Sequence, residues 1–170
     1  LVRIMLIEKN LESLIDSEIA ITRKVDSPYY KINASGRVSY LVTNDGVDME
    51  GSRLICSFLD HFEGNPQFDI SCNDDRWELL RLEERGRTMI ESGSVWIREL
   101  LREKQWRSPI LTEHEINRLK RLTYYWEDEI RNPLMNGAIN MAQITLVCAL
   151  QLEIWNPDFN WREGHPSLEE

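Results

Sequence analysis

Three short motifs in the first third of the chain carry groups suited to binding a small anionic ligand. Ser52 is placed to open a helix, where first-turn amides and the positive end of the helix dipole attract a carboxylate. Arg37, beside Gly36, is suited to pair with a second carboxylate. Val38 stands at the start of an expected strand, where its backbone can bond an extended peptide. Taken singly, Ser52 also fits a simple N-cap and Arg37 a solvated surface charge.

Cysteine and histidine offer no recognisable metal or redox site. The three cysteines are odd in number and widely spaced, with no Cys-x-x-Cys pair: Cys56, Cys72 and Cys148. The three histidines are scattered, and none has a partner at metal-ligand spacing: His61, His114 and His165. We therefore expect no metal, no disulfide framework, and a reducing, cytoplasmic location.

Composition excludes several classes of partner. The 170 residues carry a formal net charge of −9, so a broad basic face for nucleic acid or an anionic membrane is not expected. Hydrophobic residues make up 42% and charged residues 29%, as in a folded domain, and no apolar run has the eighteen residues of a membrane span. Because the first residue is Leu1 rather than Met, we expect the sequence to be part of a longer chain.

The elements that must position these motifs form an α/β pattern up to about residue 64. Apolar spacing and turn residues predict, in order, a helix at 2–10, a strand at 17–25, a short helix from Pro28, a hairpin with strands at 38–43 and 47–49, and a helix at 52–62. An α/β unit of this kind would normally start with a strand, which we do not find here.

After a turn-rich linker at 65–75, the pattern is helical throughout. One helix runs from Arg76 to about residue 101, with Gly86 and Gly93 at positions where a neighbour could approach closely. A second spans 113–131 and stops before a proline.

A third helix in this half is expected at 141–154. It begins with a capping box formed by Asn140 and Gln143 and is apolar nearly all round, which indicates the buried centre of a bundle. Cys148 inside it is expected to be a core residue rather than a nucleophile. Trp161 and the pair His165-Pro166 are expected in a loop beyond this helix.

In combination, these motifs resemble the glutathione S-transferase family. Residues 33–42, Asn-Ala-Ser-Gly-Arg-Val-Ser-Tyr-Leu-Val, are similar to the Asn-Pro-x-Gly-Lys-Val-Pro-x-Leu stretch of that family's thioredoxin-like domain, and Gly51-Ser52 stands at its acidic-Ser pair. Residues 139–145 resemble the capping box of its buried helix, and 158–168 its bacterial-type tail. The resemblance covers essentially the whole sequence in the right order.

The resemblance implies a thioredoxin-like α/β domain at 1–64, lacking its first strand, and an all-α C-terminal domain at 76–170. It implies glutathione as co-substrate, a small hydrophobic electrophile as second substrate, and a homodimer. The implied glutathione-binding residues are Arg37, Val38, Ser39, Glu50, Gly51 and Ser52. The implied substrate-pocket residues are Ser94, Trp96 and Arg98, although Trp96 also fits helix packing and Arg98 one half of an intrahelical pair.

Three departures from the family pattern bear on the site. Ser39 replaces a cis-proline, and because a non-proline cis bond costs about 3 kcal/mol, a trans or shifted loop is expected. Gly51 replaces the side chain that holds the γ-glutamyl amine, with Glu50 as a candidate replacement. The family's catalytic Ser, Cys or Tyr would come just before the residues that match 1–4, so no catalytic residue is assigned.

The function that follows is transfer of glutathione to an electrophile, with donors that lower the pKa of the bound thiol. The alternative is a non-catalytic binding or scaffold protein of the same fold, with a glutathione site eroded at Ser39 and Gly51. A thioredoxin-type reductase is disfavoured because the α/β half has no suitable cysteine, Cys56 lying in mid-helix.

Overall fold

The helices and strands of the chain divide between two units, Leu1–Asp69 and Ile70–Glu170. The computed structural model describes residues 1–62, 66–68, 75–156 and 158–170. Most of the predicted linker, 65–75, lies outside these residues, so the predicted domain boundaries stay a prediction.

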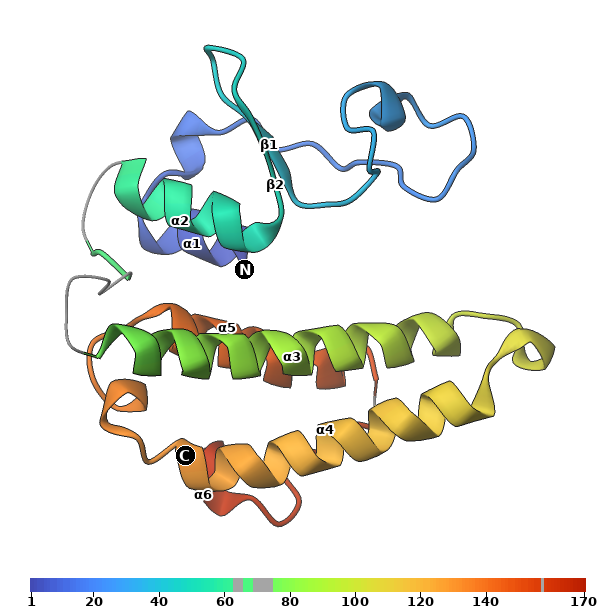
Figure 1. Cartoon of the computed structure of the whole chain (residues 1–170), viewed down its shortest axis with the longest axis vertical. Helices are drawn as coiled ribbons and strands as arrows, with labels where there is room; N and C mark the ends of the chain where they lie inside the picture. The colour runs from blue at the N-terminus through green and yellow to red at the C-terminus, as the bar shows by residue number, and fades with distance from the viewer. Residues whose placement is uncertain (63–65, 69–74, 157) are drawn as a thin grey trace. The chain divides into compact units, whose positions relative to one another are not determined.

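The first unit is built from two helices and a hairpin (Figure 1). Helix α1 (Val2–Glu8) packs against α2 (Ser52–Phe62), and strands β1 (Tyr40–Val42) and β2 (Asp48–Glu50) form an antiparallel pair. These elements confirm the predicted helices and hairpin. The 3₁₀ turns η1 (Glu12–Leu14) and η2 (Pro28–Lys31) complete the unit.

The strand predicted at 17–25 is wrong, since the chain there forms no regular element. A strand needs a hydrogen-bonded neighbour, and the sheet in the described residues contains β1 and β2 alone. The side chain of Ile19 is consequently 98% exposed, and Val25 is exposed as well. The alternation of apolar residues could not show whether a partner strand was present.

A buried ion pair joins the end of α1 to α2. Lys9 Nζ donates to Asp60 Oδ1 at 3.2 Å, to the Asp60 carbonyl at 2.9 Å and to the Pro66 carbonyl at 3.1 Å. Asp60 Oδ1 also accepts the Phe68 amide at 2.9 Å. Both charges are almost completely shielded from solvent, and their hydrogen bonds compensate the cost of that burial.

The second unit consists of three principal helices, α3 (Arg76–Leu100), α4 (Pro109–Glu129) and α5 (Met141–Leu150), with α3 packed against both others (Figure 1). Shorter pieces are η3 (Lys104–Trp106), η4 (Pro133–Met135), η5 (Gln151–Ile154) and α6 (Pro166–Glu169). The all-α character of this half confirms the prediction.

The ends of these helices differ from the predicted bounds. Helix α4 starts at Pro109 rather than residue 113, because Ser108 caps it by accepting the Leu111 amide. The capping box of Asn140 and Gln143 is confirmed, but α5 ends at Leu150 and its predicted last turn is 3₁₀. Pro166, predicted in a loop, opens α6.

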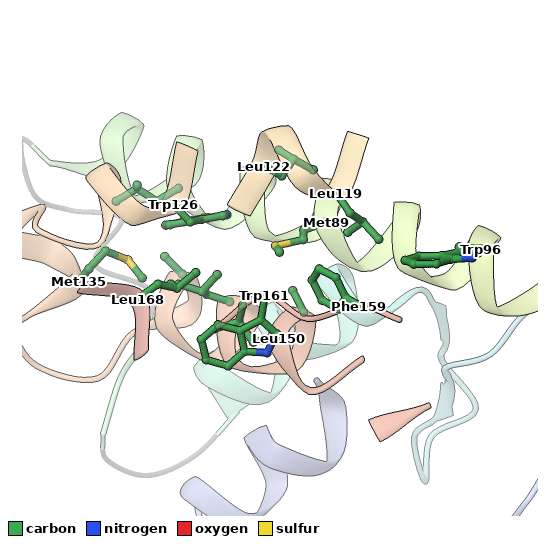
Figure 2. Packing of buried hydrophobic residues seen from close by; sticks show 14 of the residues in the cluster. Met89, Trp96, Leu119, Leu122, Trp126, Met135, Leu150, Phe159, Trp161 and Leu168 are labelled. Carbon is green, nitrogen blue, oxygen red and sulfur yellow. The ribbon is translucent and has the colours of Figure 1, made fainter. Parts of the chain in front are cut away.

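Buried apolar side chains from all three long helices meet in one core (Figure 2). Gly86 and Gly93 confirm the predicted close approach: a Cβ on Gly86 would lie 2.9 Å from Thr145 Cγ2, and one on Gly93 would lie 2.4 Å from Leu152 Cδ1. Burial of α5 is less complete than predicted, since Val147 is half exposed and Cys148 partly exposed.

Candidate functional site

Helix α2 begins at Ser52, as predicted, directly after a glycine that turns the chain. Gly51 has φ +93°, a conformation that side chains disfavour, and its carbonyl accepts the Ile55 amide at 3.1 Å. The first-turn amides of α2 and its positive dipole end therefore lie directly after this turn.

The segment that leads into β1 carries Arg37, Val38 and Ser39. Tyr29 Oη and Asn33 Nδ2 both donate to the Arg37 carbonyl, the latter at 3.0 Å. Nothing in the described parts of the chain hydrogen-bonds the backbone of Val38, whose side chain is exposed. The segment is thus fixed at Arg37 and leaves the next residue's backbone available for an extended ligand.

The expected trans peptide at Val38–Ser39 is wrong, since this bond is cis. The intrinsic preference of a peptide bond before a residue other than proline is for trans. Here hydrogen bonds flank the bond on both sides: the Arg37 carbonyl accepts from Tyr29 and Asn33, and the Ser39 carbonyl accepts from the Gly51 amide.

The structure brings the two halves of the predicted glutathione site together. The Gly51 amide donates to the Ser39 carbonyl at 3.0 Å, and Tyr40 pairs with Glu50 in the hairpin register. Six residues predicted from the resemblance therefore lie on two adjoining segments of one unit: Arg37, Val38, Ser39, Glu50, Gly51 and Ser52.

The Glu50 carboxylate connects its own segment to residues 33 and 35, which directly precede the Arg37–Ser39 segment. Its Oε2 accepts hydrogen bonds from Ser35 Oγ and from Asn33 Nδ2, the latter at 2.9 Å. The hydrogen bonds from Ser35 and Asn33 hold the pKa of the Glu50 carboxyl below its usual range, and the charge of Arg37 acts in the same direction. The carboxyl is accordingly an anion at neutral pH.

An open depression of about 430 Å³ lies beside this turn. It is lined by Glu50, Gly51, Arg53, Leu54 and Ser57. The missing side chain at Gly51 contributes to the space, and Glu50 supplies a negative charge at the edge. The turn thus combines a carboxylate with a neighbouring helix start, which suits a ligand carrying both an ammonium group and a carboxylate.

Sequence reasoning assigned no role to Asn33 and Ser35, although both belong to the motif that carried the resemblance. Asn33 Oδ1 accepts the Ser35 amide at 3.0 Å, which closes an Asx turn. Gly36 follows with φ +66°, and a Cβ there would lie 2.6 Å from Tyr30 Cε1. The Asn-x-Ser-Gly spacing was the available signal for this turn.

The predicted substrate-pocket residues lie on α3 in the second unit. Trp96 is 4% exposed and belongs to the apolar core, which is the alternative interpretation that its position in the helix allowed. Ser94 is partly buried, and the exposed Arg98 donates to the Ser94 carbonyl through Nε at 2.9 Å. A role of these residues in binding an electrophile stays a prediction.

The described residues contain neither a metal-binding group nor a membrane-spanning helix. No group of three or more His, Cys, Asp or Glu side chains there is arranged to hold a metal ion. Among the helices of that same part of the chain, none has both the length and the apolar character needed to cross a membrane.

Known structures share this architecture. A glutathione transferase family member from Pseudomonas fluorescens Pf-5, solved with bound glutathione, superposes with a TM-score of 0.89 at 22% identity, covering 99% of this chain and 83% of that one. A glutathione S-transferase from Methylobacillus flagellatus KT with glutathione bound gives 0.86 at 19% identity, with 99% and 84% coverage. Gtt2 from Saccharomyces cerevisiae gives 0.71 at 18% identity, with 99% and 92% coverage.

No family model and no curated protein matches the sequence. The structural likeness nevertheless extends over almost the entire chain and includes both units. The chain therefore has the glutathione transferase fold, a thioredoxin-like domain followed by a helical domain, which confirms the predicted fold class.

Proposed function

We propose that the first unit binds glutathione and that the protein transfers it to a small hydrophobic electrophile. One observation carries the proposal: the Ser39–Gly51 hydrogen bond joins the Arg37–Ser39 segment to the start of α2. The combination of an arginine, a Val38 backbone without a hydrogen bond in the described residues, and a helix start occurs in a fold whose solved relatives were crystallised with glutathione.

The chemistry of glutathione matches these groups. Its two carboxylates would take the helix start at Ser52 and the guanidinium of Arg37. Its cysteinyl peptide unit would pair with the backbone of Val38 in the manner of an added strand. Its ammonium group would face Glu50 at the edge of the depression beside Gly51.

In the proposed reaction, bound glutathione loses its thiol proton to solvent. The thiolate sulfur then forms a bond to an electrophilic carbon, which gives up its leaving group with the electron pair of the broken bond. The residue that stabilises the thiolate is not assigned. A homodimer and a cytoplasmic location complete the proposal.

Isothermal titration of glutathione into the chain tests binding. Ser52→Ala and Arg37→Ala should each weaken glutathione binding by about tenfold, because each removes a hydrogen-bond donor from a charged ligand group. Ser13→Ala, on the exposed surface of η1, is the matched control and should bind like the parent chain. Equal affinity for all four proteins would contradict the proposed site.

A non-catalytic binding protein is the second candidate, favoured by one observation. The Glu50 carboxylate already accepts hydrogen bonds from Ser35 and Asn33, and Gly51 has no side chain. The glutathione site would therefore be eroded where the ammonium group is held. Absorbance assays with glutathione and a chlorodinitrobenzene electrophile distinguish the two functions. Turnover that is lost in Ser52→Ala supports the transferase, and tight glutathione binding without turnover supports the binding protein.

A further inference from the structure

We infer that Asn33 is a positioning residue that holds the two halves of the proposed glutathione site in register. The inference rests on the proposed function, because the two halves are those of the proposed glutathione site. Asn33 would not contact the ligand itself. It would act through Arg37 and Glu50, each of which belongs to one half.

The contacts of Asn33 reach both halves at once. The residue is 5% exposed, and its Nδ2 donates to the Arg37 carbonyl at 3.0 Å and to Glu50 Oε2 at 2.9 Å. Tyr29 Oη lies 3.2 Å from the same nitrogen, and Oδ1 accepts the Ser35 amide. A buried amide with both its donor and its acceptor engaged fixes the geometry of all its partners.

The second bond between the halves lies at the open end of the hairpin, one residue beyond the pair of Tyr40 and Glu50. There the Gly51 amide donates to the Ser39 carbonyl. With Asn33 in place, the Arg37–Ser39 segment is attached to the Glu50–Ser52 turn at two points, which prevents it from pivoting about one bond. Because an extended ligand must meet the guanidinium, the Val38 backbone and the helix start simultaneously, the loss of either attachment should weaken binding.

The chemistry of position 33 requires an amide rather than an acid. Aspartate would keep the oxygen that accepts the Ser35 amide, but it would replace the donor with a negative oxygen facing Glu50 Oε2 and the Arg37 carbonyl. The Glu50 carboxyl is ionised at neutral pH, since hydrogen bonds from Ser35 and Asn33 lower its pKa. Asn33→Asp therefore changes a bond into a repulsion while keeping the size of the side chain.

The test is a double-mutant cycle read by glutathione titration. Asn33→Asp should weaken binding by about tenfold, as loss of a hydrogen bond to a charged group does. In the Glu50→Gln background the same substitution should cost less than about threefold, because the amide introduced at position 50 can donate to the carboxylate introduced at position 33. Asn44→Asp, which adds the same charge at the exposed hairpin turn, is the control and should change affinity less than about twofold.

A merely structural role would give a different result. It would weaken binding equally in both backgrounds and lower the thermal unfolding temperature in parallel, and that result would overturn the inference. If Asn33→Asp does not fold, Ser35→Ala removes the second bond to Glu50 from an exposed side chain and should weaken binding about threefold. Full affinity in Ser35→Ala would then overturn it.

Amide chemical shifts without ligand separate this inference from the proposed function. Asn33→Asp should move the signals of Ser35 and Gly51, which flank the two attachments, and Glu50→Gln in combination should return them toward the parent positions. If these shifts occur but the parent chain binds no glutathione, the proposed function fails and the positioning role stands. If the parent chain binds and these signals do not move, the positioning role fails.

Discussion

The helical core of the second unit and the loop that carries the candidate site in the first unit keep their shape by different means. The second unit encloses a continuous apolar core contributed by α3, α4 and α5 and by the segment after them (Figure 2). The loop that carries the candidate site in the first unit is instead held by side-chain hydrogen bonds from Tyr29, Asn33 and Ser35. Substitutions in the core of the second unit should therefore mainly change stability, whereas substitutions in this loop should mainly change binding.

The largest expected effect is on the core of the second unit. Trp126 has no exposed surface, and Trp126→Ala should lower the free energy of unfolding by about 3–5 kcal/mol through lost contacts and a cavity. Trp155→Ala, at a position 73% exposed, is the control and should cost less than about 1 kcal/mol. All six tryptophans follow residue 75, so denaturant unfolding monitored by tryptophan fluorescence reports this unit. Similar losses in both variants would contradict the comparison.

A buried charge in the first unit should have the next largest effect. Asp60→Asn leaves the Lys9 ammonium without its opposite charge in a shielded site, and we expect a loss of about 3 kcal/mol. Amide hydrogen exchange should accelerate in α1 and α2, while the fluorescence transition of the second unit stays in place. Asp16→Asn, on an exposed side chain, is the matched control. Unchanged exchange in Asp60→Asn would show that the ion pair does not hold this unit together.

A smaller effect tests how closely α3 and α5 pack. A Cβ at Gly86 meets the branched Thr145 side chain and lies 3.3 Å from the Leu146 amide nitrogen, so Gly86→Ala should destabilise the second unit by about 1–2 kcal/mol. At Gly93 the obstacle is the end of the flexible Leu152 side chain, which can rotate away. Gly93→Ala should therefore be close to neutral in the same fluorescence measurement. Equal costs at the two glycines would contradict this account of the packing.

The smallest effect is a pH dependence on the surface of the second unit. Hydrogen bonds from Arg81, and also from Tyr125 and Asn132, lower the pKa of Glu129 to about 2 from its usual 4.5. Because the folded pKa is depressed, the stabilisation is present above pH 4.5 and is lost as the pH falls toward 2. The carboxylate is partly exposed, so we expect only about 1 kcal/mol.

This prediction is checked by measuring the free energy of unfolding of Glu129→Gln and of the parent chain between pH 4.5 and about pH 2. The stability curve of the variant should be flatter, and the difference between the proteins should vanish at the acid end. Parallel curves would mean that the hydrogen bonds to Glu129 contribute no net stability.

Most of the fold could be predicted from the sequence because helix periodicity and caps are local. The capping box of Asn140 indicated where α5 begins, and Gly86 and Gly93 indicated that a neighbouring segment packs closely on α3. The strand predicted at 17–25 was wrong because strand formation depends on a partner that the local pattern does not reveal. Helix α4 starts at Pro109, before the residue 113 that the apolar stripe indicated, because Ser108 caps it.

The candidate site was predictable in its residue types but not in its connections. The resemblance placed Arg37 and Ser52 on the two segments that the structure brings together. Asn33 received no role, since its importance comes from distances to Glu50 and Arg37 that no sequence spacing encodes. The cis peptide before Ser39 was missed because the hydrogen bond between the Ser39 carbonyl and the Gly51 amide is also not visible in local sequence.

The most direct test of the central claim is a titration of the isotope-labelled chain with glutathione, followed by amide chemical shifts up to about 10 mM ligand. We expect saturable shifts concentrated at Arg37, Val38, Ser39, Gly51 and Ser52, with the amides of the core of the second unit unchanged. Absence of shifts at these five residues over that range, or saturable shifts confined to other residues, would contradict it.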